Sequence, residues 1–404
     1  MLTPPPGRRA VIVAGLRTPF AKAGTTLRDA TAADLARHCT RELLYRTELS
    51  GTEVDEVIMG QVISSPLVFN IAREVSLLPQ LPRTIPAYTL NRARASGAQA
   101  ICNAADQIMA GHADVVLAGG VESMSNVEYY TTDMRWGKRA GSVTLHDRLQ
   151  RGRERSQPEW RFGHISGMIE TAENLAKEYA IPREESDAYA VRSQQRAAEA
   201  WKTGKFKDEV VPISVPQPKG DPKTFAQDEG YRADASLETL AKLKPLMKNG
   251  TVTAGNASQQ NDAAAACLVV AEDKLKELKL EPMGYLVGWA AVGCHPATMG
   301  IGPVPAVKKL FAKTGLGFDQ MDLVELNEAF ACQVLSVLKG WGWNDPDRLN
   351  VNGSGISLGH PVAATGVRIL TTMLNELRRR KAKYGLETMC VGSGQGIAAI
   401  FERA

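Results

Sequence analysis

The sequence lacks any pattern of cysteines that would indicate a disulfide framework or a zinc site. Its cysteines are scattered along 404 residues, and no two of them form a Cys-x-x-Cys pair. Such usage is typical of a reducing compartment, where disulfides are rare. The six positions are Cys39, Cys102, Cys267, Cys294, Cys332 and Cys390. We therefore expect neither a disulfide nor a bound metal.

Long apolar runs and an excess of one charge are also missing. No run of about 18 apolar residues occurs, so we expect no membrane-spanning helix. The Pro-rich start, residues 1–10, lacks the apolar stretch of a signal peptide, and we expect a cytoplasmic location. The net charge of +4 gives no reason to expect a nucleic-acid partner.

The sequence does have length and a regular alternation of apolar patterns. With 404 residues and 44% hydrophobic residues, the chain is typical of a globular protein with two or three domains. Residues 11–14, 54–62 and 115–118 are expected to form buried strands. Residues 34–45 and 96–110 have helical spacing. This order predicts a parallel α/β sheet.

The middle of the chain differs from the parts on either side. Residues 126–250 carry many charges and several Pro-rich stretches, with helices expected only over residues 170–179 and 184–203. We expect an excursion that lies outside the sheet. Its basic stretch, residues 138–161, is better explained as a solvated surface than as a site that attracts phosphate.

The C-terminal part repeats the pattern of the N-terminal part. An Asn, a turn of small residues, a long helix, a strand and a Gly pair follow one another over residues 91–120 and again over 352–394. This repetition predicts two similar α/β halves packed together, with the functional site between them at the loops after the strands. Helices are expected at 306–314, 331–339 and 367–383, and strands at 323–326 and 388–391.

Three short segments place reactive side chains where a strand ends or a helix begins. They contain Asn327 with Glu328, His360 between Gly359 and Pro361, and Cys390. Each has an ordinary structural explanation when taken alone: a helix cap, a turn residue and a small core residue. Positions of this kind can nevertheless reach a shared cleft.

Together with their surroundings, these segments resemble the thiolase family. The resemblance runs from about Arg9 to Arg403 and rests on five motifs in order. They are "ADVVLAGGVESMS" (113–125), "TVTAGNASQQNDAAAA" (251–266), "NEAF" (327–330), "NGSGISLGHPVAATG" (352–366) and "CVGSGQGIAAIFER" (390–403).

The resemblance implies a thiolase-like α/β fold, a five-layer αβαβα sandwich of two similar halves with an inserted loop domain. The N-terminal half would comprise residues 1–125 and 251–282, the loop domain 126–250 and the C-terminal half 283–404. It also implies coenzyme A and acyl-CoA thioesters as substrates, no covalently bound cofactor, and a homodimer or homotetramer.

The same resemblance assigns roles to four residues. Cys390 would remove and return a proton at the α-carbon of the thioester. His360 and a water held by Asn327 would bind the thioester oxygen as charge develops on it. Gly392 would supply a backbone N–H to a second oxyanion. The residues expected to contact coenzyme A are Met168, Arg232, Ala254, Gly255, Ser258 and Phe330.

One position departs from the family pattern. The family carries its acyl-accepting cysteine in a segment like Asn-Arg-x-Cys-x-Ser-Gly, whereas residues 91–97 read NRARASG, with Arg94 in that place. An arginine stays protonated and cannot attack a thioester. Cys102 is no substitute, because it lies roughly 12 Å further along the same helix. A cation here opposes the helix dipole and favours binding of an anion.

Arg94 has three interpretations. The chain is an ordinary thiolase into which this substitution was introduced, a diverged enzyme, or a non-catalytic CoA-thioester-binding or partner subunit. The diverged enzyme would use its remaining groups for enolate chemistry or decarboxylation, with Arg94 holding a carboxylate of the substrate. The expected function is a thiolase-type acyl-CoA acyltransferase, performing Claisen condensation or thiolysis of 3-ketoacyl-CoA, with the acyl-enzyme step disabled by Arg94.

Overall fold

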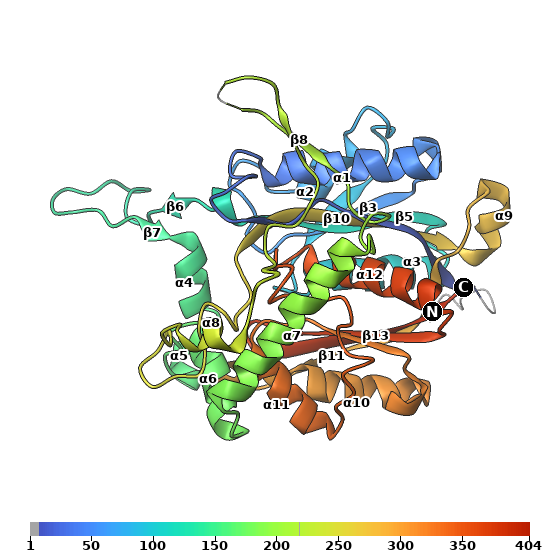
Figure 1. The fold of residues 1–404 in the computed structure, drawn as a ribbon. Coiled ribbons are helices and arrows are strands. Elements are labelled where there is room, and N and C mark those ends of the chain that lie inside the picture. The colour runs from blue at the N-terminus through green and yellow to red at the C-terminus, as the bar shows by residue number, and fades with distance from the viewer. Residues whose placement is uncertain (1–7, 218) are drawn as a thin grey trace.

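The structure, a computed structural model, describes residues 8–217 and 219–404 as five stacked layers (Figure 1). Helices form the two outer layers and the central layer, and the two halves of a large sheet lie between them. The outer layers are α1 (Ala32–Thr47) with α2 (Ile71–Ser76), and α10 (Pro303–Thr314) with α11 (Ala331–Trp341). The central layer is α3 (Ser96–Met109) with α12 (Thr365–Arg380). The predicted five-layer αβαβα sandwich is confirmed.

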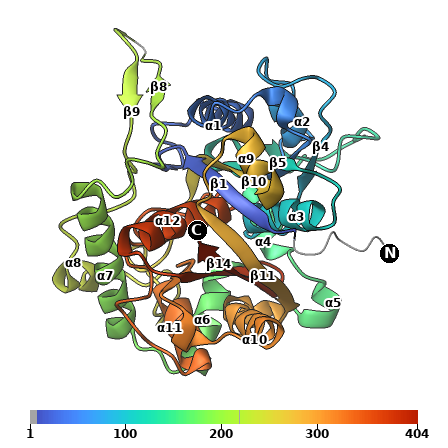
Figure 2. The ribbon, with the colours of Figure 1, turned by 90° about the vertical axis from the view of Figure 1, so that its right-hand side faces the viewer.

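Hydrogen bonds connect the sheet across both halves of the described chain. The strand order is β12-β13-β14-β11-β1-β10-β5-β3-β4, with β2 paired to β10. The halves join where Val11 and Ile12 of β1 pair with Tyr285 and Gly284 of β11. Figure 2 shows the layers after a turn of 90° about the vertical axis. The strands are β1 (Ala10–Arg17), β2 (Ala21–Lys22), β3 (Glu56–Gly60), β4 (Ala87–Leu90), β5 (Val115–Ser123), β10 (Asn261–Ala271), β11 (Gly284–Gly293), β12 (Leu323–Leu326), β13 (Tyr384–Val391) and β14 (Gln395–Arg403).

The sheet is mixed, so the expectation of a parallel sheet is only partly right. The pairs β3–β4, β3–β5 and β12–β13 are parallel, whereas β10 and β14 run antiparallel to both of their neighbours. A three-residue turn, residues 392–394, joins β13 to β14, and so short a connection forces an antiparallel pair.

Two strands continue through glycines that were expected to end them. Gly15 lies inside β1, and Gly119 and Gly120 lie inside β5. A β-carbon on Gly15 would overlap the side chain of Thr371, and one on Gly120 would overlap the carbonyl of Ala363. These glycines therefore allow the central helical layer to lie close against the sheet.

The central helices approach each other through small residues and share an apolar core with the strands. A β-carbon on Gly97 would overlap the carbonyl of Ala363, and one on Gly366 would lie 2.9 Å from the β-carbon of Ala98. Ile101 of α3 and Leu370 of α12 belong to the same buried cluster. Truncating such a core side chain to alanine costs about 2–5 kcal/mol. This packing fixes the helix starts, where the candidate site lies.

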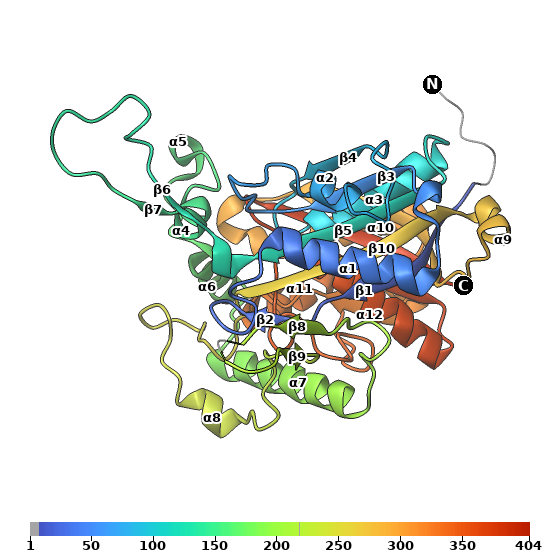
Figure 3. The same cartoon turned by 90° about the horizontal axis from the view of Figure 1, so that it is seen from above.

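Residues 126–217 and 219–250 lie largely outside the layers, and the segment between β6 and β7 extends away from them (Figures 1 and 3). The two helices expected here are present as α6 (Met168–Glu178) and α7 (Arg183–Lys202). The shorter elements were not predicted: β6 (Tyr129–Tyr130), β7 (His146–Asp147), α4 (Arg148–Glu154), α5 (Glu159–Phe162), β8 (Ile213–Val215), β9 (Lys223–Phe225) and α8 (Leu237–Ala241). The division into domains at residues 125, 250 and 282 stays a prediction.

Short turns complete the described chain. They are η1 (Gly51–Glu53), η2 (Met124–Asn126), η3 (Glu272–Lys274), α9 (Leu275–Leu278), η4 (Pro296–Ile301) and η5 (Phe318–Gln320). None of the described helices has both the length and the apolar character needed to cross a bilayer.

Candidate active site

Two neighbouring strands bring Asn327 and Cys390 to the same edge of the sheet. Asn327 follows the last residue of β12, and Cys390 is the last but one of β13. The strands are parallel, and the backbone N–H of Asn327 donates to the carbonyl of Thr388 at 3.1 Å. Both side chains are buried. The carboxyl ends of parallel strands are where α/β proteins place their ligands.

His360 is held from three sides in the loop before α12. Its backbone N–H donates to Oδ1 of Asn261 at 2.8 Å, its Nδ1 lies 2.7 Å from Oγ1 of Thr365, and its Nε2 lies 3.3 Å from Nδ2 of Asn327. Burial, together with the positive charges of Arg94 and Arg368, lowers the pKa of His360 to about 3. The imidazole is therefore neutral at ordinary pH.

The hydroxyl of Thr365 has two arrangements, and each corresponds to one tautomer of His360. It lies within hydrogen-bond distance of both Nδ1 of His360, at 2.7 Å, and the carbonyl of Pro361, at 3.3 Å. When it donates to Pro361 it accepts from Nδ1–H, and when it donates to Nδ1 the proton of the neutral ring sits on Nε2. His360 lines a cavity, so Nε2–H could then donate to an oxygen placed there. Oδ1 of Asn327 is buried and has no hydrogen-bond partner among the described residues.

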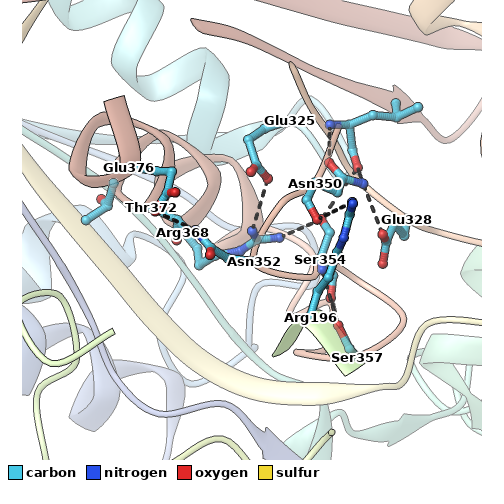
Figure 4. A network of polar contacts seen from close by, with 12 residues as sticks. Arg196, Glu325, Glu328, Asn350, Asn352, Ser354, Ser357, Arg368, Thr372 and Glu376 are labelled. Atoms are coloured by element: carbon cyan, nitrogen blue, oxygen red, sulfur yellow. Dashed lines mark hydrogen bonds and ion pairs between the residues drawn. The ribbon is translucent and has the colours of Figure 1, made fainter. Parts of the chain in front are cut away.

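Glu328 fixes the segment that carries Asn327. Its carboxylate accepts from the hydroxyls of Tyr189 at 2.9 Å and Ser193 at 2.6 Å on α7. It also accepts from Nδ2 of Asn350 at 3.0 Å (Figure 4). A further donor is the backbone N–H of Ile356, at 3.2 Å. Glu328 therefore acts as a structural link between α7, β12 and the loop before His360.

Arg94 lies in a tight turn just before α3. Ala93 adopts a left-handed backbone with a φ of 42°, and the hydroxyl of Ser96 donates to the carbonyl of Ala93 at 2.6 Å. Nη1 of Arg92 donates to Oε1 of Gln395 at 3.0 Å, which ties this turn to the start of β14. A left-handed conformation costs a residue other than glycine about 1–3 kcal/mol. The turn is therefore held in place by its surroundings.

The guanidinium of Arg94 points at the turn between β13 and β14. A β-carbon placed on Gly392 would overlap Nη1 of Arg94, so the two groups are in close contact. Burial lowers the pKa of Arg94; the Cys390 sulfur raises it and the charge of Arg153 lowers it. Burial raises the pKa of the Cys390 thiol to about 11, although Arg94 opposes that shift. At neutral pH the pair is therefore a cation beside a protonated thiol.

Two adjoining cavities, of about 910 Å³ and about 200 Å³, open onto this point. Arg94, Met124, Arg153, Met168 and Val362 line both of them. Gly392 lines the larger cavity, whereas the smaller one is lined by His360, Ser258 and Phe330. The structure thus brings Arg94, His360, Cys390, Gly392, Met168, Ser258 and Phe330 together.

Three residues expected near coenzyme A line neither cavity. Arg232 and Ala254 are exposed, and Gly255 packs against Leu240 and Leu243. Cys102 is buried within α3 in a cluster that includes Ala98 and Met389, and it lines neither cavity.

Several residues at the site were not predicted from the sequence. Asn261 and Thr365 hold His360, yet neither stands out in the sequence except as part of a motif. The basic stretch was expected to be a solvated surface, but α4 and the residue after it direct Arg148, Arg151, Arg153 and Arg155 toward the larger cavity. The expectation therefore fails for these arginines, whereas residues 138–145 are exposed as expected. The charge pattern alone does not tell which side of a short helix faces the protein. The described residues contain no cluster of three or more His, Cys, Asp or Glu side chains suited to a metal ion.

Comparison with known families covers nearly the whole chain. Residues 10–273 match the family described as thiolase, N-terminal domain, and residues 280–403 match thiolase, C-terminal domain. The chain belongs to the thiolase family.

Individual thiolases are similar over the same length. An acetyl-CoA acetyltransferase of Chromobacterium violaceum is 46% identical over 394 residues, covering 97% of this chain and 99% of that protein. The solved Bacillus anthracis acetyl-CoA acetyltransferase is 41% identical, with a TM-score of 0.93 and coverage of 98% and 99%. Human mitochondrial 3-ketoacyl-CoA thiolase in complex with CoA is 42% identical, with a TM-score of 0.92 and coverage of 98% of each chain.

Proposed function

We propose that this thiolase binds acyl-CoA at the site of His360 and Cys390 and is a thiolase-type acyl-CoA acyltransferase in which no acyl-enzyme forms at residue 94. The observation that carries the proposal is the contact of the Arg94 guanidinium with Gly392 beside Cys390. A guanidinium has no lone pair to attack a thioester, and it occupies the space next to Gly392. On this proposal the chain keeps the groups for binding and proton transfer and lacks the acyl acceptor.

Cys390 and His360 would carry out the proton chemistry. The Cys390 thiolate removes a proton from the α-carbon of the thioester, and the electrons of that C–H bond move onto the thioester oxygen as an enolate. His360 donates Nε2–H to this oxygen, which would lie near the side-chain amide of Asn327, because that amide is 3.3 Å from Nε2. Return of the proton from the Cys390 thiol regenerates the thioester. The Arg94 charge favours the thiolate, because it opposes the rise in the Cys390 pKa.

Binding of the pantetheine arm is proposed along the smaller cavity. Met168, Ser258 and Phe330 line it, and the backbone N–H of Ser258 is held by the carbonyl of Ala329 at 2.9 Å. Ala254, Gly255 and the exposed Arg232 would contact the parts of coenzyme A that lie outside this cavity, with Arg232 near the adenine. A known relative, human mitochondrial 3-ketoacyl-CoA thiolase, has been solved with CoA bound.

The test is to incubate the protein with acetyl-CoA in D₂O. We expect deuterium to enter the methyl group of acetyl-CoA, as followed by NMR, while intact mass shows no acetyl group on the protein. The variants Cys390→Ala and His360→Ala should each slow the exchange by about 100-fold or more. A stable acetyl adduct on the protein, with turnover, would overturn the proposal.

A second variant separates the three interpretations of Arg94. We expect Arg94→Cys to gain an acetyl-enzyme and thiolysis activity, because the remaining groups of the site are in place. A folded Arg94→Cys protein without activity, together with no exchange in the parent, would favour a non-catalytic binding or partner subunit. Exchange in the parent without thiolysis in the variant would favour a diverged enzyme.

A further inference from the structure

The larger cavity is lined by more positive charge than the proton chemistry requires. Five arginines face it: Arg94, Arg148, Arg151, Arg153 and Arg155. One carboxylate, that of Glu128, lies among the lining residues, and it is paired with Arg148 at 3.3 Å. The other four arginines are left without a counter-ion from the cavity wall.

These four side chains have few polar partners anywhere in residues 8–217 and 219–404. None of them forms an ion pair within that part of the chain. Nη1 of Arg151 is buried without a hydrogen-bond partner. Arg153 is met by the Gln260 amide, whose oxygen, when turned toward the guanidinium, accepts from Nη1 and Nη2 at 3.2 Å each. Arg94, Arg151 and Arg153 are half-buried, whereas Arg155 is exposed. Half-buried cations that face one cavity without a carboxylate partner favour an anionic ligand there.

The position of Arg94 shows which part of a ligand would meet this charge. Its guanidinium touches Gly392 and lies beside Cys390, at the point where both cavities meet. Arg153 also lines both cavities and lies close enough to Arg94 to lower its pKa. An acyl group whose thioester lay at His360 would therefore extend past Arg94 and then toward Arg153.

We propose that Arg94 and Arg153 form a receptor for a carboxylate on the acyl group, so that the preferred ligand is the mono-CoA thioester of a short dicarboxylic acid. This inference rests on the proposed binding of acyl-CoA at His360 and Cys390. A planar guanidinium binds a carboxylate through two parallel hydrogen bonds, which gives both strength and direction.

The phosphates of coenzyme A are the other anions that could meet these arginines. In coenzyme A they lie at the far end of the pantetheine arm, whereas Arg94 touches the reacting end of the site. The two sources are separated by thioesters of pantetheine, which carry the acyl group but no phosphate.

The experiment measures affinity by isothermal titration calorimetry with carbon-matched pairs of ligands. Malonyl-CoA is compared with propionyl-CoA, glutaryl-CoA with valeryl-CoA, and the same acyl groups are then compared on pantetheine. We expect the dicarboxylic ligand to bind about tenfold more tightly or better within at least one pair, on either carrier. Equal affinity within both pairs would overturn the receptor, although the proposed function would stand.

Variants connect the preference to the two arginines. In Arg94→Met, the affinities for the dicarboxylic ligand and its carbon-matched monocarboxylic partner should differ by no more than about twofold. Arg153→Met should reduce this ratio of affinities in part. Arg161→Met is the matched control, because Arg161 is exposed on the neighbouring α5 and lines neither cavity, and it should leave the ratio unchanged. A preference that survives Arg94→Met, or that vanishes on pantetheine, would overturn the inference. A folded protein that binds no CoA thioester at all would instead overturn the proposed function.

Discussion

Arg17 is fully buried and Arg94 is half-buried, and their surroundings differ. Arg17 ends β1 and is fully buried. Its Nε donates to Glu209 at 2.8 Å, and its Nη1 and Nη2 donate to the two carboxylate oxygens of Asp228 at 2.7 and 2.9 Å. Arg94 lies in the turn before α3 and has no ion pair or hydrogen bond from its side chain within residues 8–217 and 219–404. One arginine carries its own counter-ions, and the other does not.

The electrostatics follow this difference. Burial lowers the pKa of each guanidinium, but at Arg17 the charges of Asp228 and Glu209 outweigh burial and raise the pKa above its usual range. At Arg94 only the Cys390 sulfur opposes burial, and the pKa falls. We take Arg17 as a structural cation, which stabilises the fold, and Arg94 as a cation kept for a ligand. The comparison predicts opposite effects when each charge is removed.

The largest effect is expected at Arg17. Arg17→Met leaves two buried carboxylates without a partner, so the free energy of unfolding should fall by about 3–5 kcal/mol. Urea denaturation followed by circular dichroism measures this change. Arg17→Met combined with Glu209→Gln and Asp228→Asn should recover part of the loss. A single variant that loses less than about 1 kcal/mol would contradict the structural role.

The next effect concerns His360, which faces the unpaired cation. Its pKa in the folded protein is about 3, below the usual 6.5, because of burial and the charges of Arg94 and Arg368. Between these values the unfolded chain binds a proton that the folded chain does not, so this group makes the protein less stable as the pH falls. From about pH 6.5 to pH 5 the loss should approach 2 kcal/mol, at about 1.4 kcal/mol per pH unit.

Other buried groups change the free energy of unfolding in the opposite direction, so their contribution must be removed from the measurement. Burial raises the pKa of Glu122 to about 7 and of Glu325 and Glu387 to about 8, so these carboxyls stabilise the fold as the pH falls over the same range. The measurement is therefore the difference in unfolding free energy between the parent and His360→Asn at each pH. A difference that does not change between pH 6 and 5 would show that His360 is not kept neutral by its surroundings.

A smaller effect of the opposite sign is expected when Arg94 loses its charge. Arg94→Met removes an unpaired cation from the start of α3, where it opposes the helix dipole, so stability should rise by about 0.3–1 kcal/mol. Chemical denaturation measures the change, with exposed Arg161→Met as a control that should remain within about 0.5 kcal/mol of the parent. Clear destabilisation by Arg94→Met would mean that Arg94, like Arg17, holds the fold together.

Much of the fold could be predicted because its helices and parallel strands carry strong local patterns. The strand Leu323–Leu326 and the helix α3 lie within a residue of their expected bounds. The antiparallel strand β10 was missed, because "NDAAAACLVVA" is buried on both faces and shows no alternation. The hairpin between β13 and β14 depends on a turn through Ser393, with a φ of 68°. The Gly-Ser-Gly run marks a turn but does not tell that the chain returns as an antiparallel strand.

The candidate site could be predicted as a set of motifs but not as a geometry. The motifs singled out His360 and Cys390, and the structure places both beside Arg94. Their supports could not be found in this way, because Asn261 reaches His360 across 99 residues of sequence. The same holds for Arg151 and Arg153, since a charge run does not reveal that α4 turns these side chains toward a cavity.

The smallest expected effect tests whether Arg94 acts on Cys390 directly. Burial raises the pKa of the Cys390 thiol to about 11, and the positive charge of Arg94 opposes that rise. Removing the charge in Arg94→Met should raise the pKa further and leave less thiolate at a given pH. Alkylation of Cys390 by iodoacetamide at pH 9, followed by peptide mass spectrometry, should therefore slow by less than about tenfold, the factor that one pKa unit gives.

Two control variants accompany this measurement. Arg94→Lys keeps a charge, so its alkylation rate should lie between those of the parent and Arg94→Met. Arg17→Met should leave the rate for Cys390 unchanged while the protein remains folded. Faster alkylation in Arg94→Met would mean that the guanidinium mainly blocks access to the thiol, and its electrostatic influence on Cys390 would then be secondary.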